Sequence, residues 1–182
     1  MKYLENHRKD LVTHLKTHAL RTDGPFVLAS GGVSDWYIDG RQTTFDGEGA
    51  RLVGTCFAAM LADEVTAVGG MTMGADPIAV ATAVMADRPL KAFSVRKTAK
   101  GHGTGGRLVG PVGPDDLVAV VEDATTTGAS AATAIAVLRD EGVTVVQAIT
   151  LVDRSSGVAA ALMDQLGVPF HSVVTLEDLG VE

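Results

Sequence analysis

The sequence predicts an α/β fold in which helices flank a central, mostly parallel β-sheet. From residue 64 onward, short runs rich in β-branched residues alternate with longer segments of helical character. One run, at residues 117–121, is apolar without interruption, which is typical of a strand buried on both faces of a sheet. Strands that alternate with helices favour right-handed connections between parallel strands. No internal repeat or linker divides the chain.

The first third of the chain is expected to begin with a helix and to continue into two short strands. Apolar residues recur at helical spacing among charges over residues 2–19, which indicates an amphipathic helix. The segments PFVLAS (25–30) and DWYID (35–39) are predicted as strands joined by GGVS. An apolar-rich helix is expected over 48–62.

The rest of the chain is predicted to alternate, with one long glycine-rich loop in the middle. Pro77 falls in the first turn of its predicted helix, where a missing N–H is tolerated, and Gly142 ends the helix that contains it. The predicted ranges are strand 64–70, helix 75–87, strand 91–96, loop 97–116, strand 117–123, helix 130–142, strand 143–154, helix 156–166 and strand 170–178.

The composition indicates one globular domain, predicted to span residues 1–182. Hydrophobic residues make up 46% and charged residues 20%, so the chain can bury a core. The formal net charge of -7 argues against broad nucleic-acid binding, which requires a basic surface. It leaves room for an anionic small ligand at a local basic cluster.

The chain has the sequence features of a cytoplasmic protein without a membrane partner. Its single cysteine, Cys56, excludes an internal disulfide, and its apolar surroundings predict a buried, inert thiol. The stretch MKYLENHRKD is too polar for a signal peptide. No apolar run approaches the length of a membrane span.

Two acids followed at once by small hydroxyl residues form the clearest chemical pattern, VVEDATTTGAS at residues 120–130. A turn between a buried strand and a helix exposes backbone N–H groups, and Thr and Ser hydroxyls add donors, which together suit a phosphate. Glu122 and Asp123 before such a turn indicate that the phosphate is carried by a sugar. The two carboxylates would then accept hydrogen bonds from vicinal hydroxyls of that sugar. The alternative is that the two acids only cap the following helix.

A second pattern is a cationic cluster inside the long loop. Arg96, Lys97, Lys100 and His102 lie within seven residues, and such crowding is unfavourable unless an anion neutralises it. Flanking glycines would let the loop open and close over a substrate. The alternative is a solvated basic turn.

Charged residues lie at the carboxyl ends of three of the predicted strands. They are Arg96-Lys97, Glu122-Asp123 and Asp153-Arg154. Ligands of parallel sheets bind outside the carboxyl ends of the strands, so the three pairs are expected to meet at one edge. A surface arginine at a strand end is the alternative for Arg154.

Three stretches, taken in order, resemble one enzyme family over residues 20–180. VAVVEDATTTGAS resembles the phosphoribosyl-diphosphate signature of the type I phosphoribosyltransferases, and departs from it only at Ala124. RKTAKGHGTGG resembles the mobile catalytic loop of the orotate phosphoribosyltransferases, and FVLASGGVSDWYIDGR resembles their N-terminal hood. Ala29 stands where many members of the family carry a lysine, and Gly74 where some members carry another, although the GADP form of that segment also occurs in the family.

The resemblance implies a type I phosphoribosyltransferase-like fold, with a hood at about 1–45 plus C-terminal elements and a core at about 46–170. It implies binding of 5-phosphoribosyl 1-diphosphate by Arg96, Lys97, Lys100, His102, Glu122, Asp123, Ala124, Thr125, Thr126, Thr127, Gly128, Ala129 and Ser130. It implies orotate binding by Tyr37, Ile38, Thr126 and Arg154, and catalytic roles for Lys100, His102 and Asp123.

The implied reaction joins orotate to 5-phosphoribosyl 1-diphosphate in pyrimidine biosynthesis, giving orotidine 5′-phosphate and diphosphate. Mg²⁺ is the implied cofactor, held through the substrates rather than by the protein alone, with Asp123 as its candidate protein contact. A homodimer with shared active sites is implied as well. Two alternatives stay open: a purine-base phosphoribosyltransferase, and a non-catalytic regulator that senses a phosphoribosyl ligand.

Overall fold

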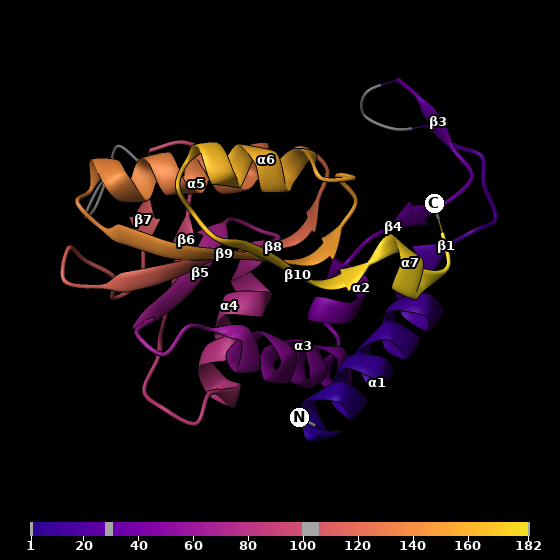
Figure 1. Ribbon diagram of the computed structural model, residues 1–182, viewed down its shortest axis with the longest axis horizontal. Coiled ribbons are helices and arrows are strands. Elements are labelled where there is room, and N and C mark those ends of the chain that lie inside the picture. Colours follow the sequence, from indigo (N-terminus) through magenta and orange to yellow (C-terminus); the bar gives the residue numbers. More distant parts are fainter. Residues whose placement is uncertain (1, 28–30, 100–105, 182) are drawn as a thin grey trace.

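The computed structural model describes residues 2–27, 31–99 and 106–181, and it confirms the predicted α/β architecture. Within these residues six strands form one sheet in the order β10-β9-β8-β5-β6-β7, and helices cover both of its faces (Figure 1). All neighbouring strands run parallel except β7, which is antiparallel to β6. The strands are β5 (Ala67–Met71), β6 (Lys91–Val95), β7 (Leu108–Val109), β8 (Leu117–Thr125), β9 (Thr144–Asp153) and β10 (Phe170–Thr175).

The pairing of β8 with β9 sets the layout of the sheet's carboxyl edge. Most residues of both strands are buried, and for β8 the uninterrupted apolar run at 117–121 predicts this. Their register ends with Thr125 opposite Asp153, so the two strands finish together. The segments that follow β8 and β9 therefore begin side by side.

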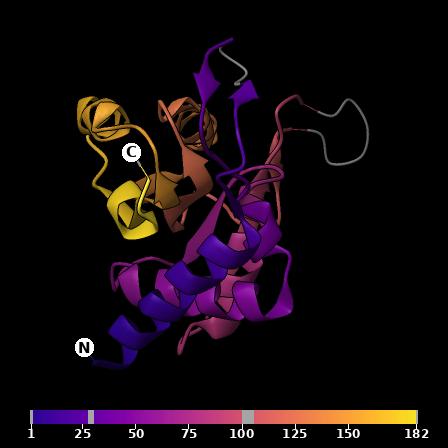
Figure 2. The ribbon, with the colours of Figure 1, turned by 90° about the vertical axis from the view of Figure 1, so that its right-hand side faces the viewer.

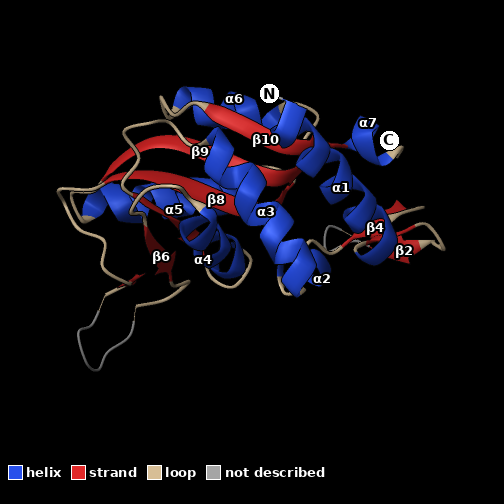
Figure 3. Cartoon of the chain, turned by 90° about the horizontal axis from the view of Figure 1, so that it is seen from below, coloured by secondary structure: helices blue, strands red, loops and turns tan. Residues whose placement is uncertain are grey.

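The helices form two layers, each with its own hydrophobic cluster. Helices α1 (Lys2–His18), α3 (Gly47–Met60) and α4 (Ala75–Met85) cover one face, while α5 (Ala129–Asp140) and α6 (Val158–Gln165) cover the other (Figures 1 and 3). Phe57 and Ile78 belong to the first cluster, and Leu138 and Met163 to the second. Cys56 is buried in the first cluster, as predicted, and burial raises its thiol pKa to about 11.

The N-terminal segment contains more structure than its sequence predicts. Strands β1 (Leu20–Arg21) and β4 (Tyr37–Ile38) pair with each other, and β2 (Phe26–Val27) pairs with β3 (Val33–Ser34) to form a projecting ribbon (Figure 2). The predicted linker GGVS thus supplies β3, and a short helix α2 (Arg41–Thr44) precedes α3. Two-residue strands are too short to produce a periodic signal. The division into hood and core stays a prediction.

Two other predicted boundaries were wrong. Strand β10 stops at Thr175, and Leu176–Leu179 form the helix α7. The reason is a capping box: Thr175 Oγ1 accepts from the Asp178 N–H at 3.3 Å, while Asp178 Oδ2 accepts from the Thr175 N–H at 2.8 Å. The predicted loop 97–116 contains β7, which pairs with β6 at Val95 and Leu108.

Helix α7 packs against α1, so the last helix of the described chain lies beside the first (Figure 1). Arg8 on α1 donates from Nε to the Val173 carbonyl at 2.8 Å and forms an ion pair with Asp178. His14, one turn and a half further along α1, hydrogen-bonds Thr43 Oγ1 at 3.2 Å and Asp46 Oδ1 at 3.1 Å. These contacts tie α1 to α2 and to the start of α3.

The close contact between α3 and α4 predicts that replacing a helix glycine by alanine destabilises the fold, whereas this change usually stabilises a helix. A Cβ at Gly54 would lie 2.5 Å from the Ala81 carbonyl oxygen. Gly→Ala in a helix interior normally stabilises by about 0.5–1 kcal/mol. Here we expect Gly54→Ala to lower the free energy of unfolding by about 1–3 kcal/mol, because the two helices must separate.

Urea unfolding measures this effect, and Gly47→Ala serves as the matched control. Gly47 begins the same helix, and nothing lies within 4 Å of a Cβ placed there. The control is expected to leave stability unchanged or slightly raised. A stabilised Gly54→Ala variant would contradict the close helix packing.

Candidate active site

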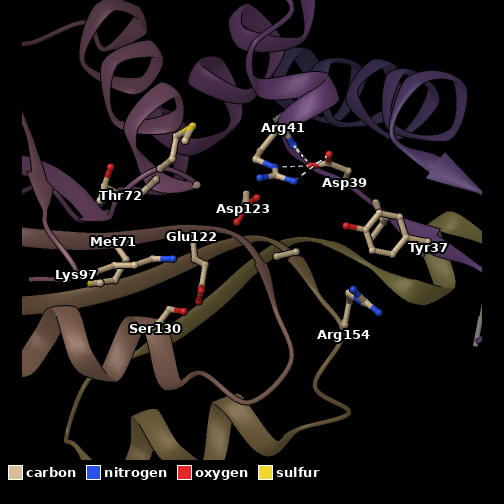
Figure 4. A pocket seen from close by; sticks show the side chains of 16 residues that line it. Tyr37, Asp39, Arg41, Met71, Thr72, Lys97, Glu122, Asp123, Ser130 and Arg154 are labelled. Atoms are coloured by element: carbon tan, nitrogen blue, oxygen red, sulfur yellow. Dashed lines mark hydrogen bonds and ion pairs between the residues drawn. The ribbon is translucent and has the colours of Figure 1, made fainter. Parts of the chain in front are cut away.

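A pocket of about 540 Å³ opens at the carboxyl edge of the sheet (Figure 4). Its walls come from segments far apart in the sequence: the β4–α2 turn, the β5–α4 turn, the end of β8 and the residue after β9. The lining consists of residues 37–41, 71–75 and 122–124 together with Lys97, Ser130 and Arg154.

Of the three charged pairs expected at this edge, the structure brings together most but not all members. Glu122, Asp123, Lys97 and Arg154 line the pocket. Arg96 does not: it lines a separate hollow with Leu108, Val112 and Glu141 among others. Consecutive residues of an extended segment point to opposite sides, so Lys97 and Arg96 face different surfaces.

Glu122 and Asp123 lie within β8, as predicted, and the strand runs two residues further than predicted, to Thr125. Burial raises the pKa of Glu122 to about 7, and the neighbouring Asp123 adds to this effect. Hydrogen bonding to Ser130 and Thr125 acts in the opposite direction. Burial also raises the pKa of Asp123. Glu122 Oε2 is buried and has no hydrogen-bond partner among the described residues.

The alternative in which these acids cap the next helix is wrong. The N-cap of α5 is Gly128, with φ of 77°, and it has no side-chain cap. The carboxylates instead face the pocket from the strand (Figure 4). They are therefore placed to accept hydrogen bonds from a ligand.

The hydroxyl-rich turn after β8 is organised by its own side chains. The Oγ1 of buried Thr125 accepts from the Gly128 N–H at 3.1 Å, and Thr127 Oγ1 accepts from the Ala129 N–H at 3.4 Å. Thr126 and Thr127 are exposed, and Ser130 lines the pocket. The N-terminus of α5 adds positive potential at this place. The turn can hold a phosphate. Of the predicted contacts in this stretch, Ala124 and Ser130 line the pocket, whereas Thr125, Thr126, Thr127, Gly128 and Ala129 do not.

Gly74 is explained by its contact with Asp123. A Cβ at this position would lie 2.5 Å from Asp123 Oδ1. The Thr72–Met73 peptide bond just before it is cis, and Thr72 Oγ1 donates to Asp76 Oδ2 at 2.7 Å. Any side chain at Gly74 would have to displace the Asp123 carboxylate.

Arg41 is a pocket residue that the sequence did not single out. Its Nε donates to Asp39 Oδ1 at 2.7 Å and its Nη2 to Asp39 Oδ2 at 3.2 Å. Figure 4 shows this paired guanidinium above Asp123, whose pKa it lowers against the effect of burial. The signal available in the sequence was a pair of charged residues, Asp39 and Arg41, at the end of a predicted strand, as at three other strand ends.

The predicted base-binding residues Tyr37, Ile38 and Arg154 meet on one side of the pocket. Arg154 is half-buried, and burial lowers its pKa. Its Nε is buried and lacks a hydrogen-bond partner among the described residues. The alternative of a freely solvated surface arginine is therefore wrong.

Several predicted residues lie outside the described part of the chain. These are Ala29, Lys100 and His102. Their roles stay predictions.

The pocket suits a hard divalent cation that a ligand helps to hold. Glu122 and Asp123 supply carboxylates, which are the oxygen donors that Mg²⁺ prefers, while both oxygens of Asp39 are bonded to Arg41. In the described ranges no three His, Cys, Asp or Glu residues are grouped to bind a metal. Ligand oxygens would have to complete the coordination, and the buried Glu122 Oε2 is available for a cation.

Comparisons with known proteins agree with one another. No protein-family model matches the chain. An orotate phosphoribosyltransferase of Streptomyces coelicolor is 45% identical over 139 residues, covering 74% of this chain and 76% of that protein. The solved orotate phosphoribosyltransferase of Mycobacterium tuberculosis in complex with Fe(III) dicitrate has a TM-score of 0.88 at 38% identity, covering 96% of this chain and 99% of that one. Its complex with 5-phospho-alpha-D-ribosyl 1-diphosphate has a TM-score of 0.83 at 35% identity, with coverage of 96% and 99%.

The raised pKa of Glu122 predicts how stability changes with pH in the ligand-free protein. The folded chain binds this proton more tightly than the unfolded chain, since the pKa rises from 4.5 to about 7. The stabilisation is complete below the unfolded value and is lost as pH rises through the folded value. In Glu122→Gln the side chain is neutral at every pH, so this variant does not lose stability through ionisation at this position.

Thermal unfolding between about pH 5 and pH 8 tests this linkage. The melting temperature of Glu122→Gln minus that of the wild type should increase as the pH increases. A difference that stays constant over this range would show that Glu122 titrates normally in the folded protein.

Proposed function

This chain belongs to the orotate phosphoribosyltransferase family, and we propose that it transfers the phosphoribosyl group of 5-phosphoribosyl 1-diphosphate to orotate. The products are orotidine 5′-phosphate and diphosphate, as required in pyrimidine biosynthesis. One observation carries the proposal. A single pocket combines two partly buried carboxylates beside a helix N-terminus with an arginine, Arg154, that pairs with no carboxylate among the described residues.

The sugar phosphate would bind at the end of β8. The turn from Thr126 to Gly128 and the first N–H groups of α5 would hold the 5′-phosphate. Glu122 and Asp123 would accept hydrogen bonds from the ribose hydroxyls. Ionised carboxylates in this place also stabilise the positive charge that develops on the ribose as the C1′–O bond breaks.

The diphosphate would leave across the wall formed by β5, α4 and Lys97. Lys97 extends into the pocket in Figure 4, and Gly74 and Ala75 bring the N-terminal end of α4 to the same wall. Cations and a helix N-terminus stabilise the negative charge of a leaving group. From the predicted loop, Lys100 and His102 would add further cationic donors.

The base would lie between Tyr37, Ile38 and Arg154. A guanidinium binds a planar carboxylate through two parallel N–H donors, and orotate carries such a carboxylate. A purine base lacks it and would leave Arg154 half-buried without a counter-charge. This contact supports orotate over the purine alternative.

Mg²⁺ is part of the proposal as a cofactor bound mainly through substrate oxygens. Asp123 would be its protein contact, with Glu122 beside it. When bound, the ion would neutralise charge on the diphosphate. The chain itself positions the sugar, holds the base and excludes water from the pocket.

We also propose a homodimer in which each loop serves the neighbouring pocket. Arg96, although predicted to bind the sugar diphosphate, faces away from the pocket of its own chain. A groove between α3 and α4 exposes apolar side chains, with Phe45 62%, Val80 58% and Val84 76% exposed. Apolar patches of this kind mark contact surfaces. Met73, just before α4, lines the pocket and is 58% exposed, so the pocket wall adds a further exposed apolar side chain near this groove.

The cellular setting rests on the sequence. No helix in the described part of the chain has both the length and the apolar character needed to cross a membrane. A cytoplasmic location and the lack of nucleic-acid partners stay predictions.

A steady-state assay that follows orotate by its ultraviolet absorbance tests the proposed activity. The purified protein should consume orotate only when 5-phosphoribosyl 1-diphosphate and Mg²⁺ are present.

Asp123→Asn should lower turnover and keep the fold, since the side chain lies in the pocket rather than in the core. Asp115→Asn, an exposed acid at the opposite end of β8, is the matched control and should behave as wild type. Normal activity of Asp123→Asn would exclude its sugar-binding role.

Arg154→Ala tests the choice of base. Loss of a hydrogen-bonded charge pair is worth about 1.5–3 kcal/mol, so the KM for orotate should rise about tenfold or more. The KM for the sugar diphosphate should change far less. Arg139→Ala, which removes an exposed arginine bonded to the Leu166 carbonyl, is the control. Equal changes in both constants would place Arg154 outside the base site.

Mixing two damaged homodimers tests the shared site. Lys100→Ala damages only the loop and Asp123→Asn damages only the sugar site. After subunit exchange, half of the molecules should be heterodimers with one intact site, so activity should recover to about a quarter of wild type. Native mass spectrometry verifies the exchange. No recovery despite verified exchange would mean that each loop serves its own chain.

A further inference from the structure

The guanidinium of Arg154 is supported from one face by an aromatic ring. Its Cζ lies 4.7 Å from the centroid of the Trp36 ring, within the range of a cation–π interaction. The Arg154 backbone N–H donates to the Thr125 carbonyl at 2.8 Å, which fixes the base of the side chain beside β8. The neighbouring Asp153 carboxylate accepts from the Ser155 N–H at 2.7 Å instead of pairing with the guanidinium.

Trp36 is itself held in place by the hood. Ser34 Oγ donates to the Trp36 carbonyl at 2.8 Å and lies 3.4 Å from the Trp36 N–H. The indole packs, partly buried, against the main hydrophobic cluster. The next residue, Tyr37, lines the pocket, whereas Trp36 does not. Trp36 therefore touches the pocket through Arg154 rather than directly.

We propose that Trp36 is a positioning residue that holds Arg154 ready for a planar pyrimidine carboxylate. The cation–π contact occupies the face of the guanidinium and leaves its N–H edge available for a carboxylate. A long arginine side chain loses rotamer freedom when it binds, and a preformed support reduces this loss. The inference rests on the proposed function and assigns the base selectivity of that site to the pair Trp36 and Arg154.

Kinetics of two Trp36 variants test the inference. Trp36→Leu removes the π face, and the KM for orotate should rise about threefold to thirtyfold. The KM for 5-phosphoribosyl 1-diphosphate should stay near its wild-type value. Trp36→Phe keeps an aromatic face, so its KM for orotate should stay close to that of the wild type. In an Arg154→Ala background, Trp36→Leu should have no further effect on the KM for orotate, because the two residues act as one unit.

A general loosening of the hood predicts other results. It would raise the KM for both substrates together, and its effect would persist in the Arg154→Ala background. Either result would overturn the inference. Melting temperatures of all variants show whether the hood and core still fold, and Trp36→Phe keeps the comparison valid if Trp36→Leu fails to fold.

A second measurement needs no turnover, because Trp36 is the single tryptophan of the chain. With diphosphate present, orotate should change the tryptophan emission of the wild type in a saturable manner, after correction for orotate absorbance. Uracil, the same ring without the carboxylate, should not. Equal responses to orotate and uracil, or no response to orotate in a protein that converts it, would overturn the inference. Failure of the proposed function would appear differently, as a wild type that consumes no orotate.

Discussion

The burial of two adjacent carboxylates on β8 is the constraint on which the rest of the site depends. Glu122 and Asp123 both have raised pKa values because the pocket desolvates them. Burying such groups is unfavourable unless nearby donors or cations compensate. Ser130 hydrogen-bonds Glu122, and Arg41 faces Asp123. The proposed ligand, a sugar diphosphate with Mg²⁺, would supply the positive charge and hydrogen-bond donors that these carboxylates still lack.

The space around these carboxylates is provided by glycines and by the edge of the sheet. Gly40 and Gly74 approach Asp123 so closely that a Cβ would lie 3.3 Å from its Cβ or 2.5 Å from its Oδ1. The register of β8 and β9 ends at Thr125 and Asp153, so Arg154 emerges beside the hydroxyl-rich turn. A rigid parallel sheet thus supports turns that carry the chemistry.

Long elements with a clear pattern could be predicted from the sequence, and short ones could not. The uninterrupted apolar run of β8 and the helical character of α5 extend over enough residues to identify both elements. Strands β1, β3 and β7 each have two residues and exist because a partner strand offers hydrogen bonds. At the C-terminus, side-chain bonding between Thr175 and Asp178 ends β10 and begins α7 directly after the β-branched run of residues 173–175, which favours a strand.

The sequence by itself determined the chemistry that is local in the chain. Glu122 and Asp123 come just before the turn from Thr125 to Gly128, so the carboxylates and the proposed phosphate-binding turn are adjacent whatever surrounds them. Only the tertiary structure decided which distant residues join them. The pairing of Trp36 with Arg154, the contact of Gly74 with Asp123 and the separation of Arg96 from Lys97 depend on strand register and on the side of the chain that each residue faces. The physical reason is that these contacts form between segments far apart in sequence, and packing of the whole fold sets them.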